Sequence, residues 1–323
     1  MNKSLSRFLQ IAIPLALGAF LLWYIYSLFT PEQLEQTYTH FKEADYWIVA
    51  FSVVLSVLSH LIRAYRWNLM FEPMGYRPKL ANNFMAVSVA YLMNLFIPKS
   101  GEVSRAVIHS KYEGIPFDKG FGTIISERVV DLFFLGMFTV AALLMQFDAL
   151  YSYIAETIPI RKMVIALIAL AILSIVFLVF LKRSKGGFAK KIKVFLGGLK
   201  EGLFSIVKMK KKGLFILLSL VIWALYVASF YAATKALDET SGFSAGIIII
   251  TFVVGSFTFA FTNSGFGTYP AAIMGILMIF GIAKSAGLAF GVIVWTSNIM
   301  SIVFFGVVSL FLLPVYNRKK ETN

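Results

Sequence analysis

Apolar runs of helical length recur along the chain, and this feature constrains the fold more than any other. At 1.5 Å per residue, a helix of roughly 20 residues crosses the hydrocarbon core of a bilayer. The chain is 59% hydrophobic and 14% charged, whereas soluble domains are about 45 to 50% apolar and about 25% charged. We therefore expect an all-α polytopic membrane protein with about six transmembrane helices. The expected spans are residues 8–29, 46–69, 121–146, 160–181, 214–236 and 288–313.

Two further apolar segments, residues 80–112 and 246–282, are broken in the middle by IPKSG and NSGFGTYP. The positive-inside rule places the bases of 99–119 and of the C-terminus in the cytoplasm, together with the N-terminus. Each broken segment must then leave on the side from which it entered, so we expect two re-entrant hairpins of opposite orientation. The order span, hairpin, span in each half predicts an inverted repeat, although the residues themselves show no convincing repeat.

A basic linker divides the single integral membrane domain, residues 1–323, into a first half, 1–181, and a second half, 213–323. The linker, 182–212, carries eleven Lys or Arg residues against Glu201 alone, with apolar residues at helical spacing. This pattern indicates a basic amphipathic helix, which we expect to contact the anionic cytoplasmic leaflet through residues 185–212. We expect no nucleic-acid partner, because binding one would leave the apolar face unburied. The sequence leaves a homodimer open.

Ionisable residues gather in the stretch 94–131, where each costs roughly 2.5 to 3.5 kcal/mol if it lies inside the membrane. Glu127 and Asp131 are four residues apart on one predicted helix, so they share a face and need a cation between them. Arg128 can reach Asp131, and Lys99 and Arg105 are candidates for the other bond. The cluster is either a structural salt-bridge network or a site whose bases hold an anionic headgroup. Its members are Asn94, Lys99, Glu102, Arg105, Glu127, Arg128 and Asp131.

Two other features are notable. Gly265 and Gly267, with Asn263 and Thr268 beside them, form either a tight turn between half-helices or a polar station whose amides bind a headgroup. Arg63 and Arg66 end the second span beside Trp67, and we interpret them as anchors at the cytoplasmic face.

The residues of the charged stretch carry a family resemblance. NLFIPKSGEVSRAVI followed by ISERVVD resembles the signature of the lysylphosphatidylglycerol synthase transmembrane-region family, also described as flippase-like. The matching positions are Asn94, Pro98, Lys99, Gly101, Glu102, Arg105, Glu127, Arg128 and Asp131. The later SGFGTYPAAIMGILMIFGI is similar to the second signature, although Asn263, Ser264 and Pro270 stand where Pro-Gly-Gly is typical. The resemblance implies the lipid-translocating portion without the aminoacyl-transferring domain.

We expect a lipid transporter of a bacterial inner membrane that moves an anionic phospholipid or a polyprenyl-phosphate-linked lipid. The chain shows no HExxH, GxSxG or P-loop motif and no cysteine, so we expect no enzyme activity, cofactor or metal. Two alternatives stay open. One is a membrane-embedded glycosyl or aminoacyl transferase, and the other is a non-transporting accessory subunit of an envelope lipid pathway.

Overall fold

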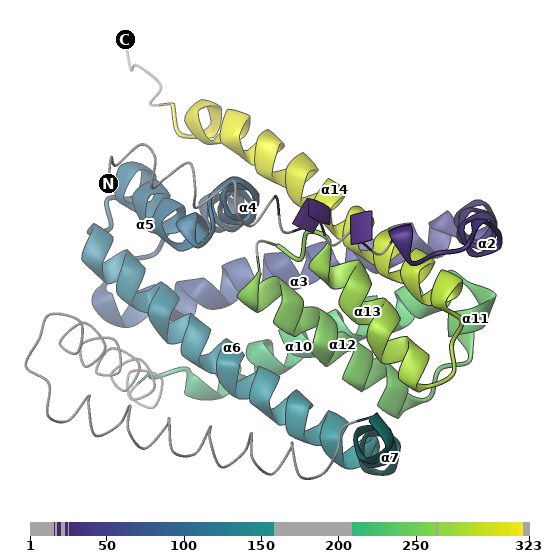
Figure 1. The fold of residues 1–323 in the computed structure, drawn as a ribbon. Coiled ribbons are helices and arrows are strands. Elements are labelled where there is room, and N and C mark those ends of the chain that lie inside the picture. The colour runs from purple at the N-terminus through teal and green to yellow at the C-terminus, as the bar shows by residue number, and fades with distance from the viewer. Residues whose placement is uncertain are drawn as a thin grey trace, which may run out of the picture.

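The computed structural model describes residues 16, 18–20, 23–24, 26–157, 209–262 and 264–318, and every regular element among them is a helix (Figure 1). Four helices are long and apolar enough to cross a membrane: α3 (Tyr46–Phe71), α6 (Phe117–Met145), α10 (Lys212–Thr234) and α14 (Lys284–Tyr316). The predicted all-α membrane class is therefore confirmed. The predicted span 160–181 lies outside the described residues, as do nearly all of the linker and much of the span 8–29.

Both broken apolar segments form pairs of short helices, as predicted. The first pair is α4 (Leu80–Phe96) and α5 (Ser100–Glu113), and the second is α12 (Ala245–Phe261) and α13 (Thr268–Ile279). In Figure 1 the first hairpin enters from the left-hand end of the long helices, and the second enters from the end where α11 (Asp238–Ser241) lies. The two hairpins thus have opposite orientations.

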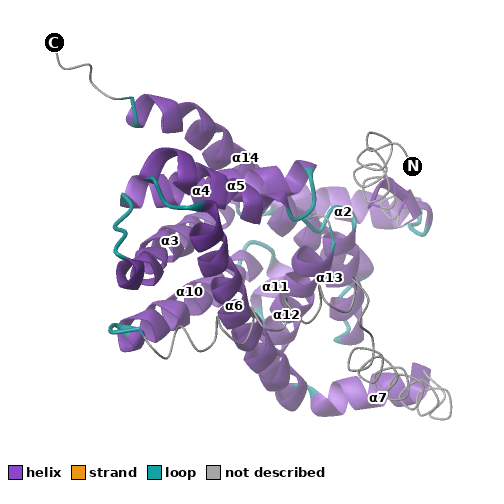
Figure 2. Ribbon diagram, turned by 90° about the vertical axis from the view of Figure 1, so that its left-hand side faces the viewer, coloured by secondary structure: helices purple, strands orange, loops and turns teal. Residues whose placement is uncertain are grey.

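Helices of the first half pack against helices of the second half. Helix α3 packs along α10, α4 of the first half packs on α14 of the second, and α12 of the second half packs on α6 of the first. Figure 2 shows α4 and α5 beside α14, with α3 and α10 side by side beneath them. Each hairpin therefore contacts a long helix of the other half, which is the arrangement expected of an inverted repeat.

Short helices occupy connections that the sequence presents as loops. Residues 31–45, which connect the predicted spans 8–29 and 46–69, contain α2 (Pro31–Glu43). The local sequence explains this difference, since Pro31 suits the first helical turn and Thr30 and Gln33 form a reciprocal capping box. The acid-bearing segment after α6 is likewise a helix, α7 (Phe147–Thr157), and the turn Glu72–Met74 extends α3.

A stack of rings brings α3, α5 and α6 together. The indole of Trp67 on α3 donates to the hydroxyl of Thr123 on α6 at 2.8 Å, and the His109 ring of α5 stacks on it at 4.0 Å. The guanidinium of Arg105, also on α5, lies over the Trp67 ring, 3.8 Å from its centroid. Because Trp67 is fully buried, the three helices meet at a fixed point, and the charged residues lie next to it.

Candidate functional site

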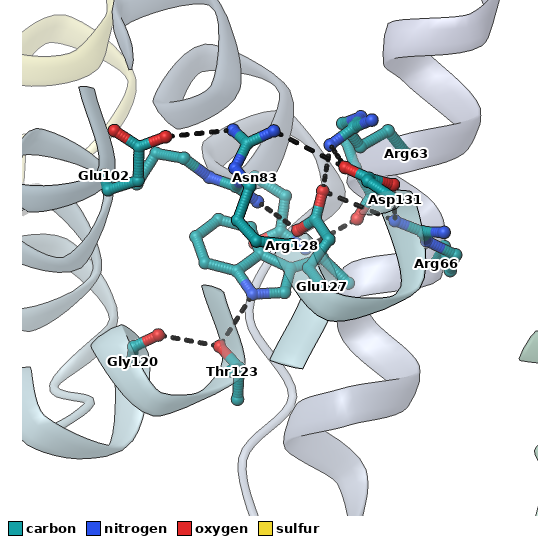
Figure 3. Close-up of polar contacts among 12 residues, drawn as sticks. Arg63, Arg66, Asn83, Glu102, Gly120, Thr123, Glu127, Arg128 and Asp131 are labelled. Carbon is teal, nitrogen blue, oxygen red and sulfur yellow. Dashed lines mark hydrogen bonds and ion pairs between the residues drawn. The ribbon is translucent and has the colours of Figure 1, made fainter. Parts of the chain in front are cut away.

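Seven ionisable side chains from three helices form one ion cluster (Figure 3). Helix α3 supplies two arginines three residues apart, α5 supplies an acid and a base, and α6 supplies three charges within five positions. Residues at these spacings project from one face of a helix, so each helix presents its charges to the other two. The members of the ion cluster are Arg63, Arg66, Glu102, Arg105, Glu127, Arg128 and Asp131.

Glu127 is the centre of the ion cluster. One carboxylate oxygen accepts from Nη1 of Arg63 and lies 3.4 Å from Nη2 of Arg66, and the other accepts from Nη2 of Arg105 at 3.0 Å. Its side chain is only 1% exposed. A buried carboxylate is tolerated when it is paired and hydrogen-bonded, and here three guanidinium groups from two other helices supply the pairing.

Asp131 is the second carboxylate between the same arginines. It accepts from Nη1 of Arg63 at 2.9 Å and from Nη1 of Arg128 at 3.4 Å, and it lies 3.6 Å from Nη2 of Arg66. Glu127 and Asp131 share a helix face, as predicted, and the cations between them are Arg63 and Arg66. At the edge of the ion cluster, Nη2 of Arg128 pairs with Glu102 at 3.2 Å.

The ion cluster has an excess of positive charge and one accessible edge. Four arginines and three carboxylates leave one net positive charge. The side chains of Arg63, Arg66 and Arg105 are at most 4% exposed, whereas that of Arg128 is 38% exposed. Arg128 is therefore the most exposed base of the ion cluster, and the other three arginines are buried.

The interpretation of Arg63 and Arg66 as anchors at the cytoplasmic face is wrong. Both side chains are buried, and they also bond to α10: Nη2 of Arg63 donates to the Tyr226 hydroxyl at 3.1 Å, and Nη1 of Arg66 donates to Ser219 at 2.6 Å. The sequence did contain a signal, because two arginines three residues apart lie on the same helix face as apolar residues. Their partners, however, lie more than 60 positions away.

Lys99 and Asn94 lie at the turn of the first hairpin, away from the carboxylates of α6. The Asn94 amide oxygen accepts from the Gly101 amide at 2.8 Å and so closes the break between α4 and α5. A side chain on Gly101 would collide with Asn94 and with the carbonyl of Ala90, which explains the glycine of this motif. Lys99 donates instead to the carbonyl of Ala260 on α12, at 2.7 Å.

The glycine turn of the second hairpin is internally bonded. The Gly265 amide donates to the Thr262 hydroxyl at 3.2 Å, and that hydroxyl lies 2.9 Å from the hydroxyl of Thr268. Gly265 and Gly267 both have left-handed φ angles, 72° and 67°, which glycine adopts without strain. Gly267 also packs against the backbone of Gly18 in the first span. Asn263 lies outside the described residues.

These features define the class of the protein: an all-helical, multi-span membrane protein with two opposed helical hairpins and a buried arginine and carboxylate cluster. The family model of the lysylphosphatidylglycerol synthase TM region matches residues 11–306. The chain therefore belongs to this family, and the resemblance noted from the motifs is confirmed.

Two curated relatives match shorter stretches. A UPF0104 membrane protein of Methanocaldococcus jannaschii is 34% identical over 107 residues, which cover 30% of this chain and 31% of the relative. The glycosyltransferase AglD of Haloferax volcanii is 32% identical over 91 residues, which cover 28% of this chain and 15% of the relative. The matches thus span less than a third of either relative. No solved structure matches the chain significantly.

Proposed function

We propose that the protein binds the phosphate group of an anionic lipid, either a phospholipid or a polyprenyl-phosphate-linked lipid, and moves it across the membrane. The observation that carries this proposal is the pair of opposed hairpins, which meet through Lys99 and Ala260. Helix α5, which begins after Lys99, carries Glu102 and Arg105 into an ion cluster with excess positive charge. Transporters built on inverted repeats bind their substrates where such broken helices meet. The chain has no nucleotide-binding motif, so we propose movement that is downhill or driven by an ion gradient or the membrane potential.

The geometry supports a division of roles within the proposed site. Arg128 is the exposed arginine, and its planar guanidinium can bind two phosphate oxygens at once. Lys99 is also exposed and supplies a second cation at the hairpin turn. Arg105 lies behind them against Glu127, where its charge adds to the attraction. Glu102, Glu127 and Asp131 orient the bases, and they are the candidates for proton carriers if transport is coupled to protons.

The second hairpin supplies the opposite polar site in this proposal, at the turn that contains Gly265, Gly267 and Thr268, and the proposal includes Asn263, which precedes this turn in the sequence. We also propose that the basic segment 185–212 contacts an anionic cytoplasmic leaflet and that both termini lie on that side of a bacterial inner membrane. Labelling of single cysteines placed near each terminus by an impermeant thiol reagent tests this orientation. The chain has no native cysteine to confuse the result.

Arg128→Gln tests the proposed site. A charge-assisted hydrogen bond contributes about 1.5 to 3 kcal/mol, so we expect a roughly ten- to hundredfold lower affinity for the anionic lipid. Native mass spectrometry of co-purified lipids measures retention, and a vesicle assay with a fluorescent phosphatidylglycerol measures translocation. Lys119→Gln, an exposed change in the first turn of α6, is the matched control. A folded Arg128→Gln protein that retains and moves the lipid like the parent contradicts the proposal.

A membrane-embedded transferase is the second candidate, because one relative is named a glycosyltransferase. The matched stretch covers only 15% of that relative, so the name of the relative is weak support for a glycosyltransferase activity of this chain. Incubation of the purified protein with lipid and a sugar-nucleotide donor, followed by mass spectrometry of the lipid, tests this candidate. A donor-dependent mass increase of the lipid would favour the transferase over the transporter.

A further inference from the structure

The turns of the two hairpins share an unusual backbone conformation. Among the described residues, Lys99 and Ser264 are the non-glycine residues with positive φ angles, 62° and 52°. Non-glycine residues rarely adopt this left-handed conformation, and those that do are held there by surrounding contacts, often at functional sites. One such residue stands in each hairpin turn, so the contacts that hold them are informative.

The two residues occupy equivalent positions. Helices α4 and α12 are each 17 residues long and end at the C-caps Ile97 and Thr262. Lys99 and Ser264 each lie two residues beyond their cap. The inverted repeat, which is absent from the residue identities, is therefore present in the register of the two hairpins.

Each of these residues donates to the last turn of the opposite hairpin's first helix. The ammonium of Lys99 donates to the Ala260 carbonyl of α12 at 2.7 Å, and the hydroxyl of Ser264 reaches the Asn94 carbonyl of α4 at 3.5 Å. The last four carbonyls of a helix have no partner within the helix and carry partial negative charge, which favours a cation there. The two turns are thus joined by a reciprocal pair of contacts, which we name the tip latch: Lys99 to Ala260 and Ser264 to Asn94.

The two residues of the tip latch differ in how firmly other contacts hold them. Ser264 is held from behind, because the indole of Trp295 on α14 donates to its carbonyl at 2.9 Å. Lys99 is exposed, and its side chain is long enough to turn toward another acceptor. A phosphate oxygen is a charged acceptor, and hydrogen bonds to it are roughly twice as strong as those to a neutral carbonyl. Lys99 is therefore the contact that an anionic headgroup can take over.

We propose that Lys99 couples headgroup binding to the opening of the tip latch. Its ammonium holds the two hairpins together through the Ala260 carbonyl, exchanges that carbonyl for the phosphate of the lipid, and so releases the turns from each other. This inference rests on the proposed function for the identity of the ligand. The contact between the hairpins is independent of it.

Spin labels at the turns measure the latch directly. The chain has no cysteine, so Ile97→Cys and Phe261→Cys create the only labelling sites, and both positions are exposed, at 43% and 76%. In phosphatidylcholine nanodiscs we expect one short distance between the labels. Loss of one hydrogen bond, worth about 0.5 to 1.5 kcal/mol, should raise the ratio of long to short distances roughly two- to tenfold in Lys99→Met.

Two variants control this measurement. Lys99→Arg keeps the charge and should keep the short distance, whereas Lys111→Met makes the same chemical change at an exposed position of the same hairpin and should leave the distance unchanged. A distance in Lys99→Met equal to that of the parent in phosphatidylcholine overturns the latch, whatever the protein transports.

The lipid dependence tests the coupling. Phosphatidylglycerol nanodiscs should lengthen the distance in the parent and in Lys111→Met and should leave Lys99→Met, already open, unchanged. Inorganic phosphate added to phosphatidylcholine nanodiscs should have no effect, and opening by it would overturn the assignment to a lipid headgroup. A parent that retains no anionic lipid and moves none refutes the proposed function. In that case the distances in phosphatidylcholine still decide the latch.

Discussion

The hairpin α4/α5 and the hairpin α12/α13 have the same layout and different chemistry. Helix α5 carries Glu102 and Arg105 into the ion cluster, whereas α12 and α13 contain no charged residue. The second hairpin instead packs closely on α14. A side chain added to Gly291 would lie 2.9 Å from Cα of Pro270, and one added to Gly287 would lie 3.2 Å from Cα of Met274.

This difference shows that the layout does not require charge. Close packing through small residues is a sufficient way to hold helices together in a membrane, where the hydrophobic effect between helices is absent. The charges on α5 are costly there, and the uncharged hairpin demonstrates that the same layout forms without them. The comparison therefore supports a functional role for the ion cluster. Substitutions that affect either hairpin can test it.

Glu127→Gln should produce the largest effect, confined to the charged hairpin. Removing one partner of a buried ion pair costs about 3 to 5 kcal/mol, and Glu127 pairs with Arg63, Arg66 and Arg105. We expect a lower unfolding temperature in detergent and faster hydrogen exchange in α5 than in α13. Glu102→Gln is the control, because Glu102 is 21% exposed and, among the described residues, forms an ion pair with Arg128 only. Equal exchange in both hairpins would remove the distinction between them.

Gly291→Leu should cause the next largest loss of stability, confined to the uncharged hairpin. Overpacking a close contact costs about 1 to 3 kcal/mol, and the leucine would push α13 away from α14. We expect faster hydrogen exchange in α13, with α5 unchanged. Gly275→Leu is the matched control, since no atom lies within 4 Å of a side chain added at that position of α13. A Gly291→Leu protein as stable as this control would show that close packing does not hold the second hairpin.

We expect the smallest change in stability from substitutions at the outer ends of the hairpins. Asn82 at the start of α4 and Asn317 after α14 exchange two hydrogen bonds, each 2.8 Å long. The start of α12 has no such pair among the described residues, and there Gly246 lies against the side chain of Gln146.

A double-mutant cycle of Asn82→Ala and Asn317→Ala measures this contact. We expect a coupling of about 1 kcal/mol in the free energy of unfolding. The cycle of Asn82→Ala with Asn298→Ala is the control and should show none, because the Asn298 amide donates to Val294 within its own helix. A coupling near zero in both cycles would mean that Asn82 and Asn317 act separately.

Much of the fold could be read from local patterns. The lengths of the apolar runs predicted α3, α6, α10 and α14, and the breaks at IPKSG and NSGFGTYP predicted both hairpins. These features depend on residues close together in the chain, so a sequence displays them directly. The helix α2 was missed because its start depends on a capping box inside a polar segment, where no apolar periodicity marks a helix.

The candidate site could be read only in part. The spacing of Glu127 and Asp131 required a cation between two carboxylates, and Arg105 and Arg128 were among the candidates. The principal cations, Arg63 and Arg66, were placed at the membrane surface instead. Lys99 was a candidate partner of these carboxylates together with Arg105, and it contacts the other hairpin instead.

The sequence by itself determined the membrane class, the helix lengths, the two breaks and the need for a cation between the two acids, because each follows from spacing along one helix. Only the tertiary structure decided which cations meet those acids and which carbonyl Lys99 contacts. Those partners come from helices 64 and 161 positions away, and helix packing alone brings them within reach.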